Sequence, residues 1–419
     1  MRRARLSTTV AVLAAVGAIS ASPWGPVAQA ATGTSPTHFA LSGLGYGSRV
    51  VGGIVPTGSN RTAYAVLGCT NLAGRTTENH ELQEDLPGLG TASEDRTEVW
   101  TSRRNGVVST SSRNTIARVD VASSPLGSLQ LNGVLAQSRA FHDRSGFHAT
   151  THASVQSISF TPAGGPPQAI DVPAPGQPVE VPGVATISVG GASRSAGAGG
   201  ASAAIDTLKI AVAATGTTTT VGHAVAAIRP GVVTGVFGGY SSGTRGEAGD
   251  GTLTSGRTPN LVMPCQGTGG HVRTRSITQT RLAGGLLVQG LSTRQLADQD
   301  ARRAHGYEQA RIAGIDLGDG KLKVAGIVGR VNVERLRNGT LRRNILGTTL
   351  GTITVNGQTE TMPASGVLEV PGVARLERNV VDRIANGLHV ISLRVTVLDG
   401  SGAVFELGEA SLRISPSGL

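Results

Sequence analysis

The six residues EVPGVA occupy positions 180–185 and return unchanged at positions 369–374. In each copy proline and glycine take the two central positions of a Val-Pro-Gly-Val stretch, starting at Val181 and Val370. A type II turn needs a fixed φ and then a positive φ at these positions, which proline and glycine supply. The stretch therefore predicts the same β-hairpin twice.

The repeat extends far beyond this turn. Matched residues keep their order along the chain: Tyr46 with Tyr240, Cys69 with Cys265, Asp120 with Asp316 and Gly222 with Gly408. Their offsets stay close, since 240 − 46 = 194, 265 − 69 = 196 and 408 − 222 = 186. Solenoid and propeller units repeat every ~20 to 50 residues, so this period indicates a duplicated domain. We expect a short linker over 31–35 and two homologous domains over 36–230 and 231–419.

Alternating apolar residues predict the fold class. Leu208, Ile210 and Val212 alternate with polar or small residues, and Leu393, Val395 and Val397 do the same in the second copy. A period of two is typical of a half-buried strand. Asn105-Gly106 lies between two further runs and predicts a tight hairpin turn. We expect an all-β chain with two tandem antiparallel sandwich or barrel-like domains and little helix.

Two segments are expected to depart from this pattern. The stretch from Thr77 to Asp85 is the best helix candidate, because Pro87 and Gly88 follow it as terminators. The glycine-rich run over 190–203 is typical of a flexible loop.

The first thirty residues have the pattern of a secretory signal peptide. Arg2, Arg3 and Arg5 precede an apolar stretch over 10–19, and Ala28-Gln29-Ala30 forms a small-residue cleavage site. A membrane anchor is the alternative, but the stretch is shorter than the ~20 residues of a spanning helix. We expect cleavage before Ala31 and a secreted, extracellular protein with no transmembrane segment in its mature chain.

Charge limits the partners. The net charge is +10, and removal of three signal-peptide arginines leaves 10 − 3 = +7. Copy two carries 21 basic and 15 acidic residues, whereas copy one carries 13 and 12. Aromatic residues make up only 3% of the chain, so base-stacking platforms are scarce and nucleic acid is not expected. The field of a basic surface can attract a wall polymer or anionic lipid, although an ordinary solvated surface is favoured. A cell-wall polymer or an envelope protein is the candidate partner.

Cys69 and Cys265 are the only cysteines, one in each copy at the same relative place. An even pair in an oxidising compartment favours a disulfide, and two separate buried thiols are the alternative. A bond would bring equivalent points of the copies within ~7 Å, measured between Cα atoms.

Several of these features resemble the choice-of-anchor P family of actinobacterial exported proteins. The resemblance rests on the signal peptide, ALSGLGYGSRV from Ala40, AVLGC ending at Cys69, and the closing strands HAVAAI and EASLRI. It implies an extracellular β-rich module of uncharacterised role, attached to the envelope by different anchors in different members. No LPxTG-like motif or terminal apolar tail follows Ile414, so we do not expect covalent wall attachment.

The motifs with catalytic or metal-binding precedents are incomplete. Gly239 to Gly243 fits G-x-S-x-G around Ser241, but no helical period follows it, so a glycine-rich turn is favoured over a hydrolase nucleophile. His80 to Glu84 lacks the second histidine of H-E-x-x-H, and DLGDGK from Asp316 lacks the terminal glutamate of a calcium loop. We expect no catalytic residue and no cofactor here.

Histidines are densest in FHDRSGFHATTH, which starts at Phe141. In a hairpin, His142 and His152 could face each other and bind a divalent ion, but a solvated hairpin is favoured and no metal is expected.

These observations favour a non-enzymatic structural or interaction protein at the bacterial cell envelope. A glycan- or wall-binding module is the alternative, and a secreted hydrolase is the third hypothesis. Binding the face of a sugar ring usually needs an exposed aromatic side chain, and Trp100 and Tyr307 are among the few aromatic residues available. Tyr46 and Tyr240, which the repeat places at one position, are the candidate ligand contacts.

Overall fold

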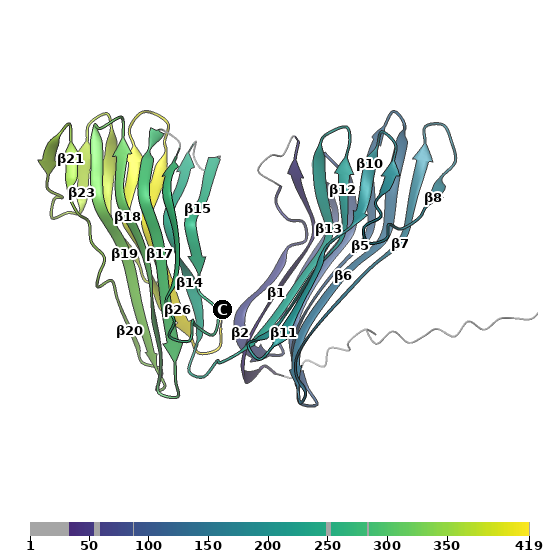
Figure 1. The fold of residues 1–419 in the computed structure, drawn as a ribbon, viewed down its shortest axis with the longest axis horizontal. Coiled ribbons are helices and arrows are strands. Elements are labelled where there is room, and N and C mark those ends of the chain that lie inside the picture. Colours follow the sequence, from purple (N-terminus) through teal and green to yellow (C-terminus); the bar gives the residue numbers. More distant parts are fainter. Residues whose placement is uncertain (1–32, 54–58, 87, 249–252, 283–284, 419) are drawn as a thin grey trace, which may run out of the picture. The chain divides into compact units, whose positions relative to one another are not determined.

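The computed structural model describes residues 33–53, 59–86, 88–248, 253–282 and 285–418. The signal peptide predicted over 1–30 lies outside these residues, as do the first two residues of the expected linker over 31–35. Ser35 already begins the first strand. The described chain is all-β and has no α-helix, as the sequence predicts (Figure 1).

Two antiparallel sheets are built from the first copy. Sheet 1a has the order β2-β1-β13-β12-β10-β9, with β11 beside β12, and sheet 1b has the order β3-β4-β5-β6-β7-β8. Their strands are β1 (Ser35–Gly52), β2 (Ala65–Ala73), β3 (Thr76–Leu86), β4 (Gly90–Arg104), β5 (Val107–Ser124), β6 (Gly127–Asp143), β7 (Gly146–Pro162), β8 (Gln168–Ile170), β9 (Val179–Val181), β10 (Ala185–Val189), β11 (Ala192–Gly197), β12 (Gly200–Val212) and β13 (Thr217–Pro230).

The second copy builds two sheets of matching order. Sheet 2a runs β15-β14-β26-β25-β24-β23, and sheet 2b runs β16-β17-β18-β19-β21-β22, with β20 beside β19. Their strands are β14 (Val236–Ala248), β15 (Leu253–Val262), β16 (Arg273–Arg281), β17 (Leu287–Gln299), β18 (Arg303–Leu317), β19 (Leu322–Leu336), β20 (Leu341–Asn344), β21 (Ile353–Val355), β22 (Gln358–Glu360), β23 (Val367–Val370), β24 (Ala374–Asp382), β25 (Gly387–Val397) and β26 (Val404–Ser415).

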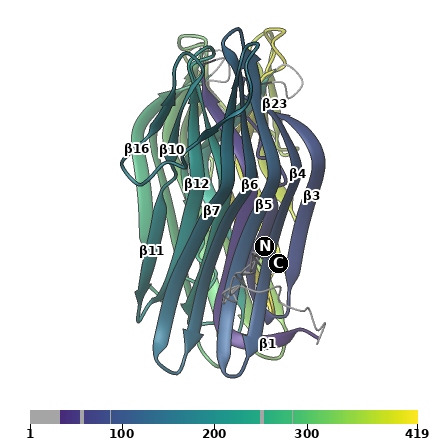
Figure 2. The same cartoon turned by 90° about the vertical axis from the view of Figure 1, so that its right-hand side faces the viewer.

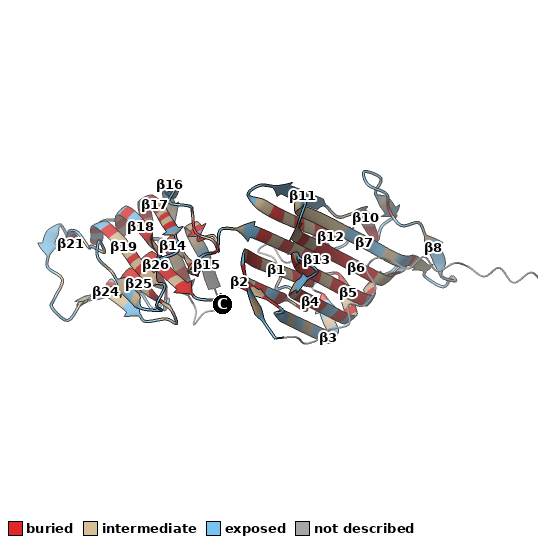
Figure 3. Cartoon of the chain, turned by 90° about the horizontal axis from the view of Figure 1, so that it is seen from below, coloured by how far each residue is buried: buried red, intermediate tan, exposed pale blue. Residues whose placement is uncertain are grey.

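Each pair of sheets packs face to face as a sandwich. One apolar core joins sheets 1a and 1b and includes Leu131 of β6 and Ile210 of β12. A second core joins sheets 2a and 2b and includes Val324 of β19 and Val395 of β25. Buried and more exposed residues alternate along the strands, as Figure 3 shows by colour. The alternation follows from the period of two, because one face of each sheet is covered and the other is not.

Both repeated hairpin turns form as predicted. Gly183 has φ +72° and Gly372 has φ +67°. The Val184 amide donates to the Val181 carbonyl at 2.9 Å, and the Val373 amide donates to the Val370 carbonyl at 3.0 Å. The Asn105-Gly106 turn is also confirmed, with both residues at positive φ between β4 and β5.

Two local predictions were wrong. The segment from Thr77 to Asp85 is a strand within β3, because pairing with β4 satisfies its backbone groups. The glycine-rich run over 190–203 is ordered as β11 and the start of β12, paired with each other from Ala192 to Ile205. Cross-strand hydrogen bonds outweigh the low strand propensity of glycine here.

The register also corrects the alignment of the tyrosines. Tyr46 lies opposite His223, and Ser242 lies opposite Glu409, the residue that corresponds to His223 in copy two. Tyr46 therefore corresponds to Ser242, at an offset of 242 − 46 = 196. By the same register Tyr240 corresponds to Leu44. A shift of two residues keeps each side chain on the same face of its strand, so the alternating pattern cannot reveal it.

Candidate functional site: a groove on sheet 2b

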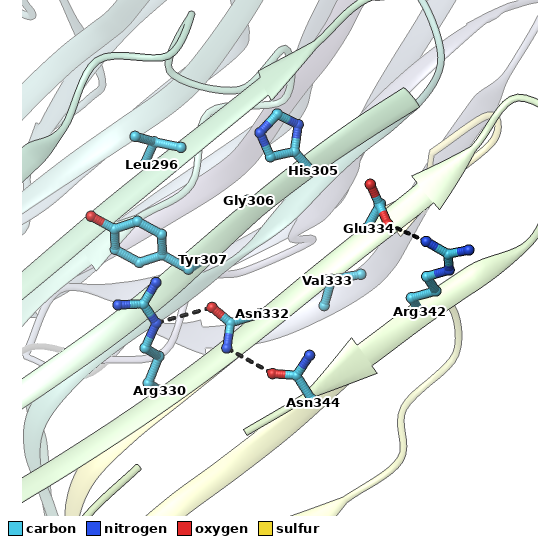
Figure 4. Close-up of a pocket in the computed structure, with 10 residues that line it drawn as sticks. All are labelled: Leu296, His305, Gly306, Tyr307, Arg330, Asn332, Val333, Glu334, Arg342 and Asn344. Carbon is cyan, nitrogen blue, oxygen red and sulfur yellow. Dashed lines mark hydrogen bonds and ion pairs between the residues drawn. The ribbon is translucent and has the colours of Figure 1, made fainter. Parts of the chain in front are cut away.

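A groove of about 340 Å³ lies on sheet 2b (Figure 4). One row of facing residues crosses it: Leu296 of β17, Tyr307 of β18, Asn332 of β19 and Asn344 of β20. The next row holds His305, Glu334 and Arg342. The rows form because side chains at alternate positions of paired strands stand on one face of the sheet.

These side chains point away from the sandwich interior. Their strand neighbours Ala304, Val331 and Val333 belong to the buried apolar core beneath the groove. Alternation places His305, Tyr307 and Asn332 on the opposite face of the sheet. The groove is therefore a feature of the outer face, where a ligand can reach it.

The acidic residue of the groove is neutralised by neighbouring arginines. Glu334 pairs with Arg303 at 2.9 Å and with Arg342 at 3.4 Å. The Arg342 side chain is 68% exposed, so most of it remains open to solvent. Two arginines and Glu334 thus meet at this end of the groove, and Asp298 of β17, which lies opposite His305, adds a second acidic residue to the row.

Arg330 lies at the other end, against neutral groups. Its Nε donates to Asn332 Oδ1 at 2.9 Å, and its guanidinium lies 4.0 Å from the centre of the Tyr307 ring. Asn332 in turn donates from Nδ2 to Asn344 Oδ1 at 3.0 Å. Among the described residues, no carboxylate forms an ion pair with Arg330. Its charge is therefore available to an anionic ligand.

One polar atom of the groove has no partner. His305 Nδ1 is buried and makes no hydrogen bond within the described part of the chain. A buried polar atom without a partner costs about 1–3 kcal/mol, which a ligand that bonds to it would recover. The groove thus combines a free cation, amide groups and an unused imidazole nitrogen, which suits a ligand rich in hydroxyl and acidic groups.

Tyr240 lies elsewhere, in a polar network on sheet 2a. Its hydroxyl donates to Glu409 Oε1 at 2.5 Å, and the Arg257 guanidinium stands 4.3 Å from its ring centre. Arg257 Nε also donates to Glu409 Oε2 at 2.9 Å. A sugar ring would have to displace Arg257 to stack on that face of Tyr240.

Glu409 is the centre of this network and only 1% of its side chain is exposed. Burial alone would raise its pKa, but hydrogen bonds from His389, Arg257 and Tyr240 outweigh burial and hold the pKa at about 2. His389 also contacts Asp382, at 3.3 Å from Nδ1. The network satisfies its own charges and has a structural role in sheet 2a.

Tyr46 is even less accessible, with 7% of its surface exposed. Its ring stacks on His223 at a centroid distance of 4.4 Å, and Arg61 lies 5.4 Å from its ring centre. His223 is held by Asp206 at 2.5 Å. The structure therefore does not bring Tyr46 and Tyr240 together at a common exposed position.

The serine of the G-x-S-x-G motif points into the second sandwich. Ser241 is fully buried on β14 and its Oγ donates to Glu308 Oε2 at 2.8 Å. The strand continues to Ala248, so the sharp strand-to-helix turn of a nucleophile elbow is not formed here. Burial raises the pKa of Glu308 well above its ordinary value, which favours a neutral carboxyl beside Ser241.

The histidines of β6 and β7 do not face each other, contrary to the geometry considered from the sequence. His142 lies opposite Phe147 and packs at a tilt against Phe39, with ring centroids 4.9 Å apart, whereas His152 lies opposite Gln137. A hairpin turn at 144–145 sets this register, which separates the two histidines by several residue pairs. In the described ranges, no three His, Cys, Asp or Glu side chains gather as a metal site.

A second cavity, of about 530 Å³, lies beside the edge of sheet 1b and is lined by Glu81, Glu84 and Thr62 among others. Asp95, fully buried nearby, accepts hydrogen bonds from Asn114 Nδ2 at 2.7 Å and from Thr62 Oγ1 at 2.9 Å. Burial raises the pKa of both Asp95 and Glu84, and the neighbouring carboxyl groups add to the shift of Glu84. The side chains of Glu81, Glu84 and Asp95 form a cluster of carboxyl groups at the edge of sheet 1b.

A disulfide joins the two copies. Cys69 on β2 is bonded to Cys265, which follows β15, with 5.4 Å between the Cα atoms. Ala40, Val232 and Val236 pack around the two sulfurs. Next to the bond, the Thr70 hydroxyl donates to the Ser417 carbonyl at 2.7 Å, so the chain end also contacts β2.

The groove was missed by the sequence analysis, which named only Tyr307 from it. A signal was present in the alternation of Arg330, Asn332 and Glu334, which lie on one face of strand β19. The partners on β17, β18 and β20 depend on register, which the sequence did not supply.

No helix in the described ranges is long and apolar enough to cross a membrane. In comparisons with known proteins, no family model, no curated protein and no solved structure matches this chain.

Proposed function

We propose that this chain is an exported, non-enzymatic interaction protein of the bacterial cell envelope, in line with its resemblance to choice-of-anchor P proteins. The inter-copy disulfide supports an oxidising compartment, where such bonds persist. The burial of Ser241 against Glu308 supports a structural role for the G-x-S-x-G motif.

We further propose that the sheet 2b groove binds an anionic wall glycan. The carrying observation is Arg330, a cation that faces amides and an aromatic ring and has no carboxylate partner among the described residues. Arginine binds carboxylate and phosphate through two parallel hydrogen bonds, whereas Asn332 and Asn344 can bind sugar hydroxyls. This observation supports the glycan-binding alternative. The proposed binding site is the groove, in place of Tyr46 and Tyr240.

The test is co-sedimentation of the purified protein with cell walls that carry or lack their acidic polymers. We expect retention on the acidic walls, and a loss of about tenfold in affinity for Arg330→Ala, the order of one charge-assisted contact. The matched control is Arg337→Ala, an exposed arginine of the turn after β19.

Equal retention of Arg330→Ala and the native protein would reject the groove as the binding site. Equal retention on walls with and without acidic polymer would reject the anionic ligand. A double variant, Tyr46→Ala with Tyr240→Ala, tests the alternative contacts in the same assay.

A further inference from the structure

The two strands that begin sheets 1b and 2b are edge strands of opposite charge. β3 is the terminal strand of sheet 1b and β16 is the terminal strand of sheet 2b, and the two hold the same place in the repeated topology. Figure 2 shows β3 at the side of its sheet, beside β4. Each pairs with one neighbouring strand in the described structure, so one backbone edge of each remains without a ladder partner.

All carboxyl, lysine and arginine side chains of β3 are carboxyl groups, whereas all those of β16 are arginines. β3 carries Glu78, Glu81, Asp85 and Glu84, of which burial favours the neutral form of Glu84, and it has no lysine or arginine. β16 carries Arg273, Arg275 and Arg281 and has no acidic residue. Identical edges would therefore repel each other, while β3 and β16 attract, which is how charged edges set partner choice.

Of the β16 arginines, Arg273 acts within the molecule through its charge, which lowers the pKa of the buried Glu308 against the larger effect of burial. Arg275 donates to the Asn260 carbonyl at 3.0 Å, and none of the three arginines forms an ion pair with a carboxylate in the described ranges. On β3, Glu78 pairs with Arg96 at 2.8 Å, and Glu81 accepts from the Ala63 amide at 2.9 Å.

The side chains also stand on compatible faces. Glu81 lies opposite the buried Asp95 of β4, so it points to the interior side of sheet 1b at its edge. Arg275 lies opposite the buried Thr293 of β17, so it points to the interior side of sheet 2b. If the two edges formed one continuous sheet, acidic and basic side chains would stand on the same face and could pair across it.

We propose that molecules of this protein associate head to tail, with the acidic β3 edge of one copy pairing to the basic β16 edge of the next. Every molecule has one edge of each kind, so the contact is heterologous and extends to a chain of copies unless it closes into a ring. The inference is independent of the glycan groove.

The test is sedimentation velocity of the purified mature protein over a range of concentrations. We expect the average mass to rise with concentration at about 0.01 M salt and to fall to that of the monomer at about 1 M salt, where the screening length drops from ~30 to ~3 Å. A monomer at every concentration in low salt would overturn the proposal.

Charge reversal tests the surfaces themselves. Arg273→Glu with Arg275→Glu, and separately Glu81→Lys with Asp85→Lys, should each weaken self-association by about tenfold or more, because like charges then meet at the contact. Arg302→Glu with Arg337→Glu is the matched control for the arginine reversal, because it makes the same change of net charge in exposed turns flanking β18 and β19, and it should leave association unchanged.

Mixing the two reversed variants restores complementary edges, so association should return in the mixture. Its return excludes misfolding as the cause of the loss. If the mixture stays monomeric while both variants keep the native circular dichroism spectrum, the edge-to-edge pairing is wrong. Should Glu81→Lys with Asp85→Lys fail to fold, an unchanged self-association of the Arg273→Glu, Arg275→Glu variant would by itself refute the proposal.

Discussion

Glu84 shows how the position of one residue sets its chemistry. It lies opposite Ala92, a core residue, at the edge where β3 borders the second cavity. Burial is the largest cause that raises its pKa, to about 9, and the hydrogen bond with Glu81 and the charge of Asp95 act in the same direction. A neutral carboxyl is therefore favoured in the folded state over most of the neutral range.

This shift predicts a pH dependence of stability. A pKa that is raised on folding means that the folded state binds the proton more tightly, so the stability from Glu84 is complete below about pH 4.5 and is lost as pH rises through about 9. Glu84→Gln removes this loss. We expect the melting temperature of Glu84→Gln to fall less between pH 5 and pH 9 than that of the native protein.

Thermal melts across that range check the prediction, with the exposed Glu360→Gln on β22 as the control. If the melting temperatures of the native protein and of Glu84→Gln fall by the same amount between pH 5 and pH 9, the prediction is wrong.

At the scale of elements, the two sheets of the second sandwich come into backbone contact. A Cβ added to Gly329 of β19 would lie 1.8 Å from the Gly408 carbonyl oxygen of β26. Gly408 itself has φ +66°, which a residue with a side chain adopts at a cost. In copy one the place of Gly329 is taken by Ala136, which is buried against Ile205 and Ala224, so the two sandwiches space their sheets differently at this level.

We predict that Gly329→Ala destabilises the protein by about 1–3 kcal/mol, because an added methyl group must push the two strands apart. Urea unfolding measures the change in free energy. Gly199→Ala, in the open turn between β11 and β12 with no atom within 4 Å of the new Cβ, should stay within about 0.5 kcal/mol of the native value. A similar loss in both variants would argue against close sheet contact as the cause.

At the scale of the whole molecule, the disulfide joins residues 196 positions apart, one from each sandwich. Closing so long a loop removes chain entropy from the unfolded state, worth up to about 5 kcal/mol in the entropic account. The bond therefore couples the stability of two bodies that have separate cores.

Thiol titration of the purified protein should find no reactive thiol in denaturant without reductant and two after reduction. Cys69→Ser with Cys265→Ser should unfold at a lower denaturant concentration than the oxidised native protein. Two titratable thiols without reductant would show that the bond does not form. In that case the double variant would unfold at the same denaturant concentration as the native protein.

The sequence by itself determined the all-β class, the duplication and the positions of the tight turns, because these depend on local periodicity and on glycine and proline at fixed places. Val181 to Val184 needed no tertiary information, since proline fixes one dihedral angle and glycine permits the next. The even cysteine pair raised the disulfide as a hypothesis but left separate thiols open.

Only the tertiary structure decided which residues of paired strands face each other and which strands lie at the edges of the sheets. It showed that Tyr46 corresponds to Ser242, that the charged segment at 77–85 is an edge strand, and that Tyr307 and Arg330 share a groove. The physical reason is that strand pairing joins residues far apart in the chain, and a period of two fixes which face a side chain occupies but not which residue it meets. Hydrogen bonds and core packing between distant strands make that choice.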